Sequence, residues 1–381
     1  MKASQPKDIV CEMLGSSGVQ INGDRPWDMR IHNPDVYERV LSGGSLALGQ
    51  SYMDGWWDCD ALDQFFEKIM ENRLDKKPKA ASVAALWTVL KTKLLNAQSR
   101  SRAYIIGERH YDTGNDLFSI MLDKGLNYSC AYWKEAETLD AAQEAKLDLI
   151  CRKIGLKPGM TVLDIGCGWG GFAKFAAEKY GAGIYGITVS REQVEYANNC
   201  CRPLDVKIEL KDYREVREKF DRVISIGMFE HVGFKNYRTF VKVVHRCLKD
   251  DGLFLLHTIG GNTSVNSNDP WINQYIFPNS MLPSSKQIAE AIEGLFVLED
   301  WHNFGQYYDK TLMVWYDNFK KNWARIKDRY DERFFRMWTY YLLSSAGSFR
   351  SRRNQLWQIV FSKKGIREAH PYRERYFASV H

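Results

Sequence analysis

The sequence lacks the features that mark membrane-spanning, secreted and metal-binding proteins. No stretch of its 381 residues approaches the ~20 apolar residues of a membrane span. The Met1-Lys-Ala-Ser start has no apolar signal core. The eight cysteines are scattered, without a C-x-x-C pair or a Cys/His spacing suited to zinc. We therefore expect no bound metal and a cytoplasmic protein with reduced thiols.

Charge is distributed unevenly along the chain. The formal net charge is +6. Residues 73–109 hold nine Lys/Arg against two Asp/Glu, and residues 350–375 hold eight against two. Such segregation favours an anionic partner, either lipid head groups or nucleic acid, although a merely solvated basic face remains an alternative. We expect no nucleic-acid partner, because the chain has no RNA-binding module and no basic run interleaved with stacking aromatic residues.

The most informative stretch runs from Thr161 to Phe172 and reads T-V-L-D-I-G-C-G-W-G-G-F. An apolar run typical of a buried parallel strand leads into four glycines, and a helical pattern follows. Glycines let the backbone turn sharply and approach a ligand, and the helix start then offers unpaired N–H groups. The pattern predicts a strand, a ligand-binding turn and a helix.

The glycine spacing alone does not identify the ligand, because it satisfies both the dinucleotide fingerprint and the looser pattern of S-adenosylmethionine enzymes. Asp164 within the motif resembles the acid that such methyltransferases hold near the loop. A nicotinamide enzyme needs an acid ~20 residues further on, where this chain has Thr188. These two features favour S-adenosylmethionine over NAD or FAD.

Strands and helices alternate through the C-terminal part of the chain. This alternation predicts an α/β fold with a mostly parallel, doubly wound sheet that binds its ligand at the carboxyl ends of the strands. The predicted strands are 161–166, 183–189, 206–211, 221–227, 252–259, 296–302 and 355–361. The predicted helices are 117–122, 139–154, 170–180, 191–201, 235–248 and 285–294.

Composition changes divide the chain into three expected parts: a small α+β N-terminal domain (1–79), an amphipathic helix and basic linker (80–102), and the catalytic domain (103–381). Within the first part we expect a helix near residues 9–14 and short strands at 19–24 and 29–34 around a turn.

Three stretches have two interpretations each. Trp56 and Trp57 suit either a core or a membrane interface. The helix at 83–94 could lie on a bilayer or pack between domains. The insert at 260–283, rich in Asn, Ser and Pro, is typical of a lid or substrate loop.

Five further stretches are typical of one family: His110–Phe118 (HYDTGNDLF), Asn127–Trp133 (NYSCAYW), Gly227–Gly233 (GMFEHVG), Leu255–Gly260 (LLHTIG) and Trp301–Asp309 (WHNFGxYYD). Together with Tyr52–Trp57 (YMDGWW) near the N-terminus, they closely resemble bacterial cyclopropane-fatty-acyl-phospholipid synthases over nearly the whole chain. Mycolic acid cyclopropane synthases are more distant and lack the N-terminal segment. The resemblance implies a seven-stranded class I methyltransferase (Rossmann-like) domain.

The resemblance also implies a reaction, its cofactors and its partners. A methylene group would pass from S-adenosylmethionine to the cis double bond of an unsaturated phospholipid acyl chain, with bicarbonate as the proton acceptor. It implies a lipid-binding N-terminal domain and a homodimer. The two basic segments, 73–109 and 350–375, predict peripheral association with the anionic inner face of the cell membrane. One departure concerns Ser345, because some relatives carry a cysteine there, so a thiol at this position is dispensable.

The resemblance also implies which residues of this sequence form the bicarbonate site and the donor-binding site. The expected bicarbonate cage is Cys130, Glu230, His257, Ile259 (through its backbone) and Tyr308. The expected donor-binding residues are Tyr128, Ser129, Val162, Leu163, Asp164, Ile165, Gly166, Cys167, Gly168, Trp169, Gly170, Thr188, Val189, Ser190, Arg191, Glu192, Gln193, Asp212 and Tyr213. Two alternatives remain: a methyltransferase with a methyl-branched lipid, RNA or small-molecule product, and a non-enzymatic lipid-binding protein.

Overall fold

The computed structural model describes residues 5–72 and 114–367. These residues form two compact units. One unit holds the described parts of 96–266, 280–307 and 355–381, and contains the large sheet. The other holds those of 1–95, 267–279 and 308–354. The expected continuous domain 103–381 is therefore divided between the two units.

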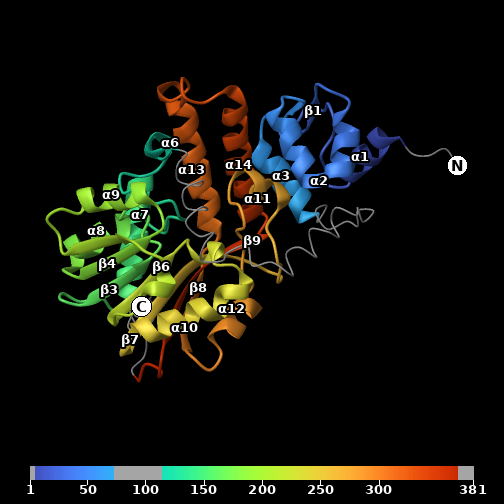
Figure 1. Ribbon diagram of the computed structural model, residues 1–381. Helices are drawn as coiled ribbons and strands as arrows, with labels where there is room; N and C mark the ends of the chain where they lie inside the picture. Colours follow the sequence, from blue (N-terminus) through green and yellow to red (C-terminus); the bar gives the residue numbers. More distant parts are fainter. Residues whose placement is uncertain (1–4, 73–113, 368–381) are drawn as a thin grey trace. The chain divides into compact units, whose positions relative to one another are not determined.

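The sheet unit is built on seven strands in the order β5-β4-β3-β6-β7-β9-β8 (Figure 1). β3 to β7 pair in parallel, while β8 and β9 are antiparallel to each other. The bounds are β3 Thr161–Ile165, β4 Gly183–Thr188, β5 Val206–Leu210, β6 Phe220–Ile226, β7 Leu248–Gly261, β8 Val297–Asn303 and β9 Asn354–Ser362. All seven predicted strands and the doubly wound α/β class are confirmed. The chain adds β4 and β5 on one side of β3 and then returns to place β6 on its other side, so the order reverses between β3 and β6. Such a switch point is where an open parallel sheet binds its ligand.

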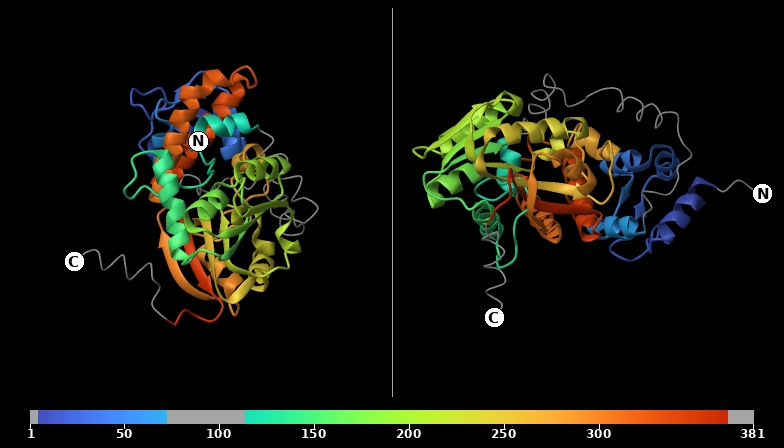
Figure 2. Two further views of the ribbon diagram at one scale, coloured as in Figure 1. Left: turned by 90° about the vertical axis from the view of Figure 1, so that its left-hand side faces the viewer. Right: turned by 90° about the horizontal axis from the view of Figure 1, so that it is seen from below.

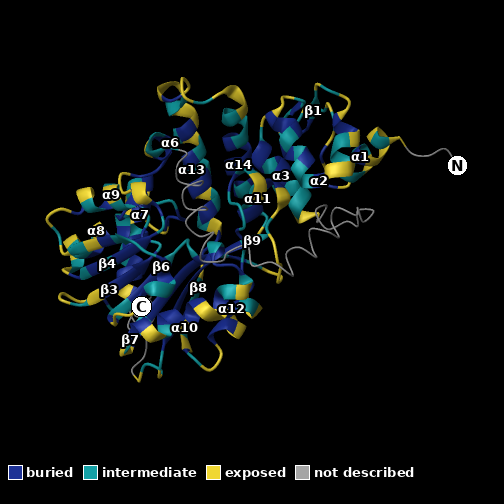
Figure 3. Ribbon diagram, viewed as in Figure 1, coloured by how far each residue is buried: buried dark blue, intermediate teal, exposed yellow. Residues whose placement is uncertain are grey.

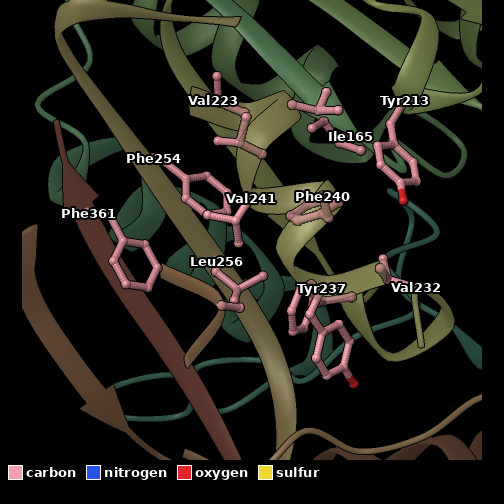
Figure 4. Close-up of a cluster of buried hydrophobic side chains, with 14 of the residues drawn as sticks. Ile165, Tyr213, Val223, Val232, Tyr237, Phe240, Val241, Phe254, Leu256 and Phe361 are labelled. Atoms are coloured by element: carbon pink, nitrogen blue, oxygen red, sulfur yellow. The ribbon is translucent and has the colours of Figure 1, made fainter. Parts of the chain in front are cut away.

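Side chains alternate between the two faces of the sheet. Leu163 and Ile165 pack in the core beneath α10 and α12, whereas Val162 packs beneath α7, α8 and α9. Figure 4 shows the first of these cores around Phe254 and Phe361. Helices therefore cover both faces, as Figure 2 also shows, and near-continuous apolar runs are what such a sheet requires. The helices are α6 Asn115–Met121, α7 Leu139–Lys153, α8 Gly171–Tyr180, α9 Arg191–Cys200, α10 Tyr237–Cys247 and α12 Ser285–Ile292.

The second unit packs N-terminal helices against a helical hairpin from late in the chain. Gly347 of α14 lies so close to α3 that an added Cβ would stand 2.5 Å from the Asp63 carbonyl oxygen. Arg350 of α14 pairs with Asp63 at 2.6 Å and with Asp309 at 2.9 Å. The elements are α1 Pro6–Gly15, β1 Arg30–Ile31, α2 Val36–Met53, β2 Trp57–Asp58, α3 Leu62–Glu71, α11 Pro270–Tyr275, α13 Gln306–Asn322 (from Tyr308 onward) and α14 Glu332–Arg350.

Several sequence-based expectations for this second unit need correction. Of the two short strands expected at 19–24 and 29–34, the second contains β1, whereas the first is wrong, because only an isolated bridge at Ile21 joins it to Met29 and β1 pairs with β2. α13 and α14 were not predicted. The insert 260–283 contains α11, whose Trp271 contacts Met53 of α2. Trp57 has no exposed surface, so of its two interpretations, core or membrane interface, the structure supports the core.

The helix at 83–94, the linker and the basic segment 73–109 lie outside the described residues. Within the described ranges, no helix combines the length and the apolar character needed to cross a bilayer.

Candidate active site

The glycine turn after β3 forms one wall of a pocket at the carboxyl edge of the sheet. Gly166, Gly168 and Gly170 have φ of 83°, 55° and 85°, a region that suits glycine. A Cβ on Gly166 would lie 2.7 Å from Met228, whereas the space beside Gly168 is open. Gly170 is the residue that precedes α8. The turn therefore brings bare backbone and the start of a helix to the pocket.

Most of the expected donor-binding residues line this pocket. Those on its wall are Tyr128, Ser129, Asp164, Ile165, Gly166, Cys167, Gly168, Trp169, Thr188, Val189, Gln193, Asp212 and Tyr213. The others do not line it. Val162 and Leu163 belong to the cores on the two faces of the sheet. Gly170, Arg191 and Glu192 also lie off the wall, and Ser190 caps α9 by accepting a hydrogen bond from Gln193 N–H.

The pocket holds buried polar atoms suited to a charged ligand. Asp164 is 1 % exposed, and burial raises the pKa of its carboxyl to about 7, against which the Lys146 ammonium acts. In the described part of the chain, neither Asp164 Oδ1 nor the Tyr213 hydroxyl has a hydrogen-bond partner. Thr188 donates a hydrogen bond to Gln193 Oε1 at 2.6 Å, which orients that amide on the pocket wall.

Sequence reasoning missed the contribution of α7. Lys146 is 1 % exposed, lines the pocket and donates to Ser129 Oγ at 3.0 Å. Gln143, one turn earlier, donates to the Ser129 carbonyl oxygen at 2.9 Å. The signal was present in the sequence, because both polar residues share the face of α7 that buries Ala142 and Leu147. Other unpredicted wall residues are Leu126, Asn127, Gly171, Phe172, Ile187, Lys211, Arg214, Ile226, Gly227, Met228, His231 and Val232.

A second polar centre lies at the ends of β6 and β7. Glu230 follows β6 in a short 3-10 turn, Phe229–His231, and its Oε1 accepts a hydrogen bond from Ile259 N–H at 2.7 Å. His257 lies two residues before Ile259 on β7, so both side chains point to the same face. Gln358 donates to His257 Nδ1 at 3.2 Å, which leaves the ring hydrogen on Nε2 when the imidazole is neutral.

Burial sets the protonation of this second centre. It raises the pKa of Glu230 to about 7, with the Ile259 N–H acting against the rise. Burial lowers the pKa of His257 well below its usual value, and the nearby positive charges of Lys146 and Lys153 lower it further. Among the described residues, neither Glu230 Oε2 nor His257 Nε2 has a partner. A carboxyl and a neutral imidazole are thus held dry, each with one uncommitted atom.

The other two expected cage residues differ in position. Cys130 is fully buried in the sheet unit, and its thiol interacts with the Ala131 carbonyl oxygen at 3.3 Å. Tyr308 belongs to the other unit, where its ring packs against Phe349 with centroids 4.5 Å apart. The structure thus groups four of the five expected cage residues in one unit, and the participation of Tyr308 stays a prediction.

Comparison with known proteins shows the family of this chain. Residues 98–359 match the family model described as mycolic acid cyclopropane synthetase. The chain is 54 % identical over 364 residues to the cyclopropane-fatty-acyl-phospholipid synthase of Escherichia coli (strain K12), covering 95 % of each chain. The chain belongs to the cyclopropane synthase family.

Solved structures of this family share the fold. The cyclopropane synthase MmaA2 from Mycobacterium tuberculosis superposes with a TM-score of 0.64 and 31 % identity, covering 68 % of this chain and 98 % of that one. The mycolic acid cyclopropane synthase CmaA1 complexed with SAH and CTAB has the same TM-score at 32 % identity, with the same shares of the two chains covered. The family model begins at residue 98, so the N-terminal 97 residues lie outside the matched range.

Proposed function

We propose that this protein transfers the methyl carbon of S-adenosylmethionine to the cis double bond of a phospholipid acyl chain and closes a cyclopropane ring, releasing S-adenosylhomocysteine. Its 54 % identity to the Escherichia coli synthase over 95 % of both chains supports this activity. The observation that carries the mechanism is the pair of buried atoms without partners, Glu230 Oε2 and His257 Nε2.

The pocket beside the glycine turn suits the methyl donor. A related synthase, CmaA1, was crystallised with S-adenosylhomocysteine. Asp164 and the Tyr213 hydroxyl provide polar atoms without partners, and the Gly168 backbone leaves open space for a ligand. We assign donor binding to these residues together with Ser129, Thr188 and Gln193, which line the same pocket.

The chemistry requires a base in a dry site. When the S–CH₃ bond breaks and a C–C bond forms, positive charge appears on the neighbouring alkene carbon, and water must be excluded from it. A proton then leaves the added carbon and the ring closes. Bicarbonate, when bound, supplies a small replaceable base. Glu230 and His257 would hold it through their uncommitted atoms, and Ile259 N–H positions the Glu230 carboxylate.

The lipid substrate implies contact with a membrane, and we propose peripheral association with its anionic inner face, a lipid-binding role for the N-terminal domain and a homodimer. The structure shows that some basic residues of the segment 350–375 already pair with acidic side chains and are therefore less available to bind an anionic membrane. Arg350 is engaged by Asp63, Glu67 and Asp309. Lys364 lies 2.8 Å from Asp250. Both cations already pair with acidic side chains, so we expect Arg350 and Lys364 to contribute little to an anionic docking face.

The decisive experiment is product analysis with Glu230→Gln. Wild-type protein, S-adenosylmethionine and unsaturated phospholipid vesicles should yield lipid with one added CH₂ and ring protons in the proton spectrum. Glu230→Gln should keep its affinity for S-adenosylhomocysteine in calorimetry but lose most turnover, and wild-type turnover should depend on dissolved carbonate. Glu290→Gln, on the exposed side of α12, is the matched control and should behave as wild type.

Two results would contradict the proposal. A methyl-branched chain with two further hydrogens would require a hydride donor and would indicate a branching enzyme. Full turnover of Glu230→Gln in carbonate-free buffer would remove the bicarbonate centre from the mechanism.

A further inference from the structure

The turn between α13 and α14 carries an arrangement of aromatic and basic side chains that the mechanism does not use. α13 ends at Asn322, a 3-10 turn covers Trp323–Arg325, and α14 begins at Glu332. Figure 3 shows that the connection between the two helices is exposed. We call residues 319–338 the hairpin tip.

The aromatic residues of the hairpin tip stack on one another. Tyr330 and Phe334 have ring centroids 4.3 Å apart, and Phe334 is nearly parallel to Trp338 at 5.9 Å. Trp323 is also nearly parallel to Phe334, at 6.5 Å. Phe319 of α13 stacks on Phe335 of α14 at 5.3 Å, which joins the two helices. Trp323, Tyr330, Phe334 and Phe335 are only partly buried, so the ladder has an apolar body with edges that reach solvent.

Cations are frequent in the same stretch of the chain. From Lys320 to Arg333 there are six Lys/Arg against three Asp/Glu. Four of the cations are exposed and make no ion pair with any described residue: Lys320, Lys321, Arg325 and Lys327. One of the acids, Asp331, is already used, because its side chain accepts a hydrogen bond from Phe334 N–H at the start of α14. Lys320 and Lys321 also suit the C-terminal end of α13, but Arg325 and Lys327 lie beyond it.

We propose that the hairpin tip is a docking site for anionic phospholipid head groups. Tryptophan and tyrosine favour the membrane–water interface because their rings are apolar and their polar atoms remain hydrated. Long Lys and Arg side chains next to such rings lay their apolar stems on the aromatic surface and reach lipid phosphates with their charged ends. Partly exposed aromatic rings, with exposed cations in the same turn of the chain, match this surface in both polarity and charge. The inference rests on the proposed lipid substrate, and it assigns docking to residues other than the two basic segments of the sequence.

The test compares two charge-neutralised variants of the full chain. The tip variant combines Lys320→Gln, Lys321→Gln, Arg325→Gln and Lys327→Gln. The control combines Lys157→Gln, Lys179→Gln, Lys219→Gln and Lys242→Gln, four exposed lysines of the sheet unit. Both remove the same charge, so a general electrostatic effect would weaken both equally. Co-sedimentation with phosphatidylglycerol–phosphatidylethanolamine vesicles measures docking, and phosphatidylcholine vesicles provide the uncharged reference.

The expected result is a loss of at least ~10-fold in partitioning of the tip variant onto anionic vesicles, with the control close to wild type. Added salt should reduce the difference by screening. Hydrogen exchange of wild-type peptides covering 323–335 should slow when anionic vesicles are present. Unchanged melting and S-adenosylhomocysteine binding of the tip variant would show that the loss is not a folding defect.

Equal partitioning of the tip variant and wild type, or equal losses in the two variants, would overturn the docking site. Failure of the proposed function is read separately, as an absence of cyclopropane product from wild-type protein and a short-chain unsaturated phospholipid in solution. Docking at the tip without that product would contradict the function and leave the surface assignment standing.

Discussion

Lys146 is the residue whose position most changes the interpretation of the donor pocket. Its buried ammonium has a pKa lowered to about 8 by desolvation, and it interacts with Asp123, Cys130 and Asp164. It also contributes to the low pKa of His257. One buried cation thus influences the donor pocket and the Glu230 centre together, because charges interact strongly where water is excluded.

This arrangement predicts that donor binding depends on pH. The pKa of Asp164 is raised to about 7, so its carboxyl becomes protonated as the pH falls through that value. The cationic donor should prefer the ionised carboxyl, and its affinity should therefore fall up to ~10-fold per pH unit below the pKa. Lys146→Met removes a charge that lowers the pKa of Asp164, so the midpoint should move upward. Calorimetric titration of S-adenosylmethionine on both sides of neutrality measures this. Asp164→Asn, the control, should bind weakly with no such midpoint, and a flat wild-type profile would contradict the assignment.

A substitution at Gly168 has two expected effects, backbone strain and loss of the space that the ligand occupies, and a second glycine with positive φ can separate them. Gly168→Val places a β-branched residue at φ 55°, and Gly159→Val does so at φ 78°; neither added Cβ meets an atom within 4 Å. Both variants should lose ~1–2 kcal/mol of unfolding free energy. Only Gly168→Val should also abolish S-adenosylhomocysteine binding, because Gly159 is not on the pocket wall. Chemical denaturation and calorimetry measure the two effects, and donor binding by Gly168→Val at wild-type strength would show that the ligand does not approach this turn.

At the scale of elements, the contact between α3 and α14 depends on Gly347. An alanine Cβ there would lie 2.5 Å from the Asp63 carbonyl oxygen and 2.8 Å from Glu67 N, both backbone atoms that cannot move independently. Gly347→Ala should therefore cost ~1–3 kcal/mol of unfolding free energy, as overpacking does. Gly15→Ala, where nothing lies within 4 Å, is the control and should not destabilise. Denaturant titration compares the two, and equal stability would mean that the helices separate without cost.

At the scale of the whole molecule, we expect S-adenosylhomocysteine to stabilise one of the two compact units more than the other. The described pocket wall belongs entirely to the sheet unit. S-adenosylhomocysteine at a concentration of ~100 times Kd should raise the unfolding free energy of that unit by ~2.7 kcal/mol. Hydrogen exchange of β3 and β4 in rising denaturant measures this gain. Gly168→Val should lose the gain, and an equal gain in that variant would place the ligand elsewhere.

Local sequence signals were sufficient for the catalytic sheet. The alternation of strand and helix patterns located all seven strands, and buried strands such as β3 carry the apolar runs that a sheet covered on both faces needs. Positive φ at Gly166, Gly168 and Gly170 follows from the glycine turn that the sequence predicted. The motif stretches placed Glu230 and His257, although their roles remain predictions.

Only the tertiary structure decided the remaining features, because they depend on contacts between distant parts of the chain. β1 pairs with β2, with 25 residues between the two strands, rather than with the nearby segment 19–24. α14 packs with α3 although more than 260 residues separate them. Lys146 on α7 could be placed against Ser129 only once the helix had packed. The amino-acid sequence by itself determined the fold class, the ligand turn and the family, since each depends on a local pattern: the alternation of strands and helices, the glycine turn and the motif stretches. Burial determined which carboxyls have raised pKa values and which buried atoms remain uncommitted, since desolvation depends on everything that surrounds a group.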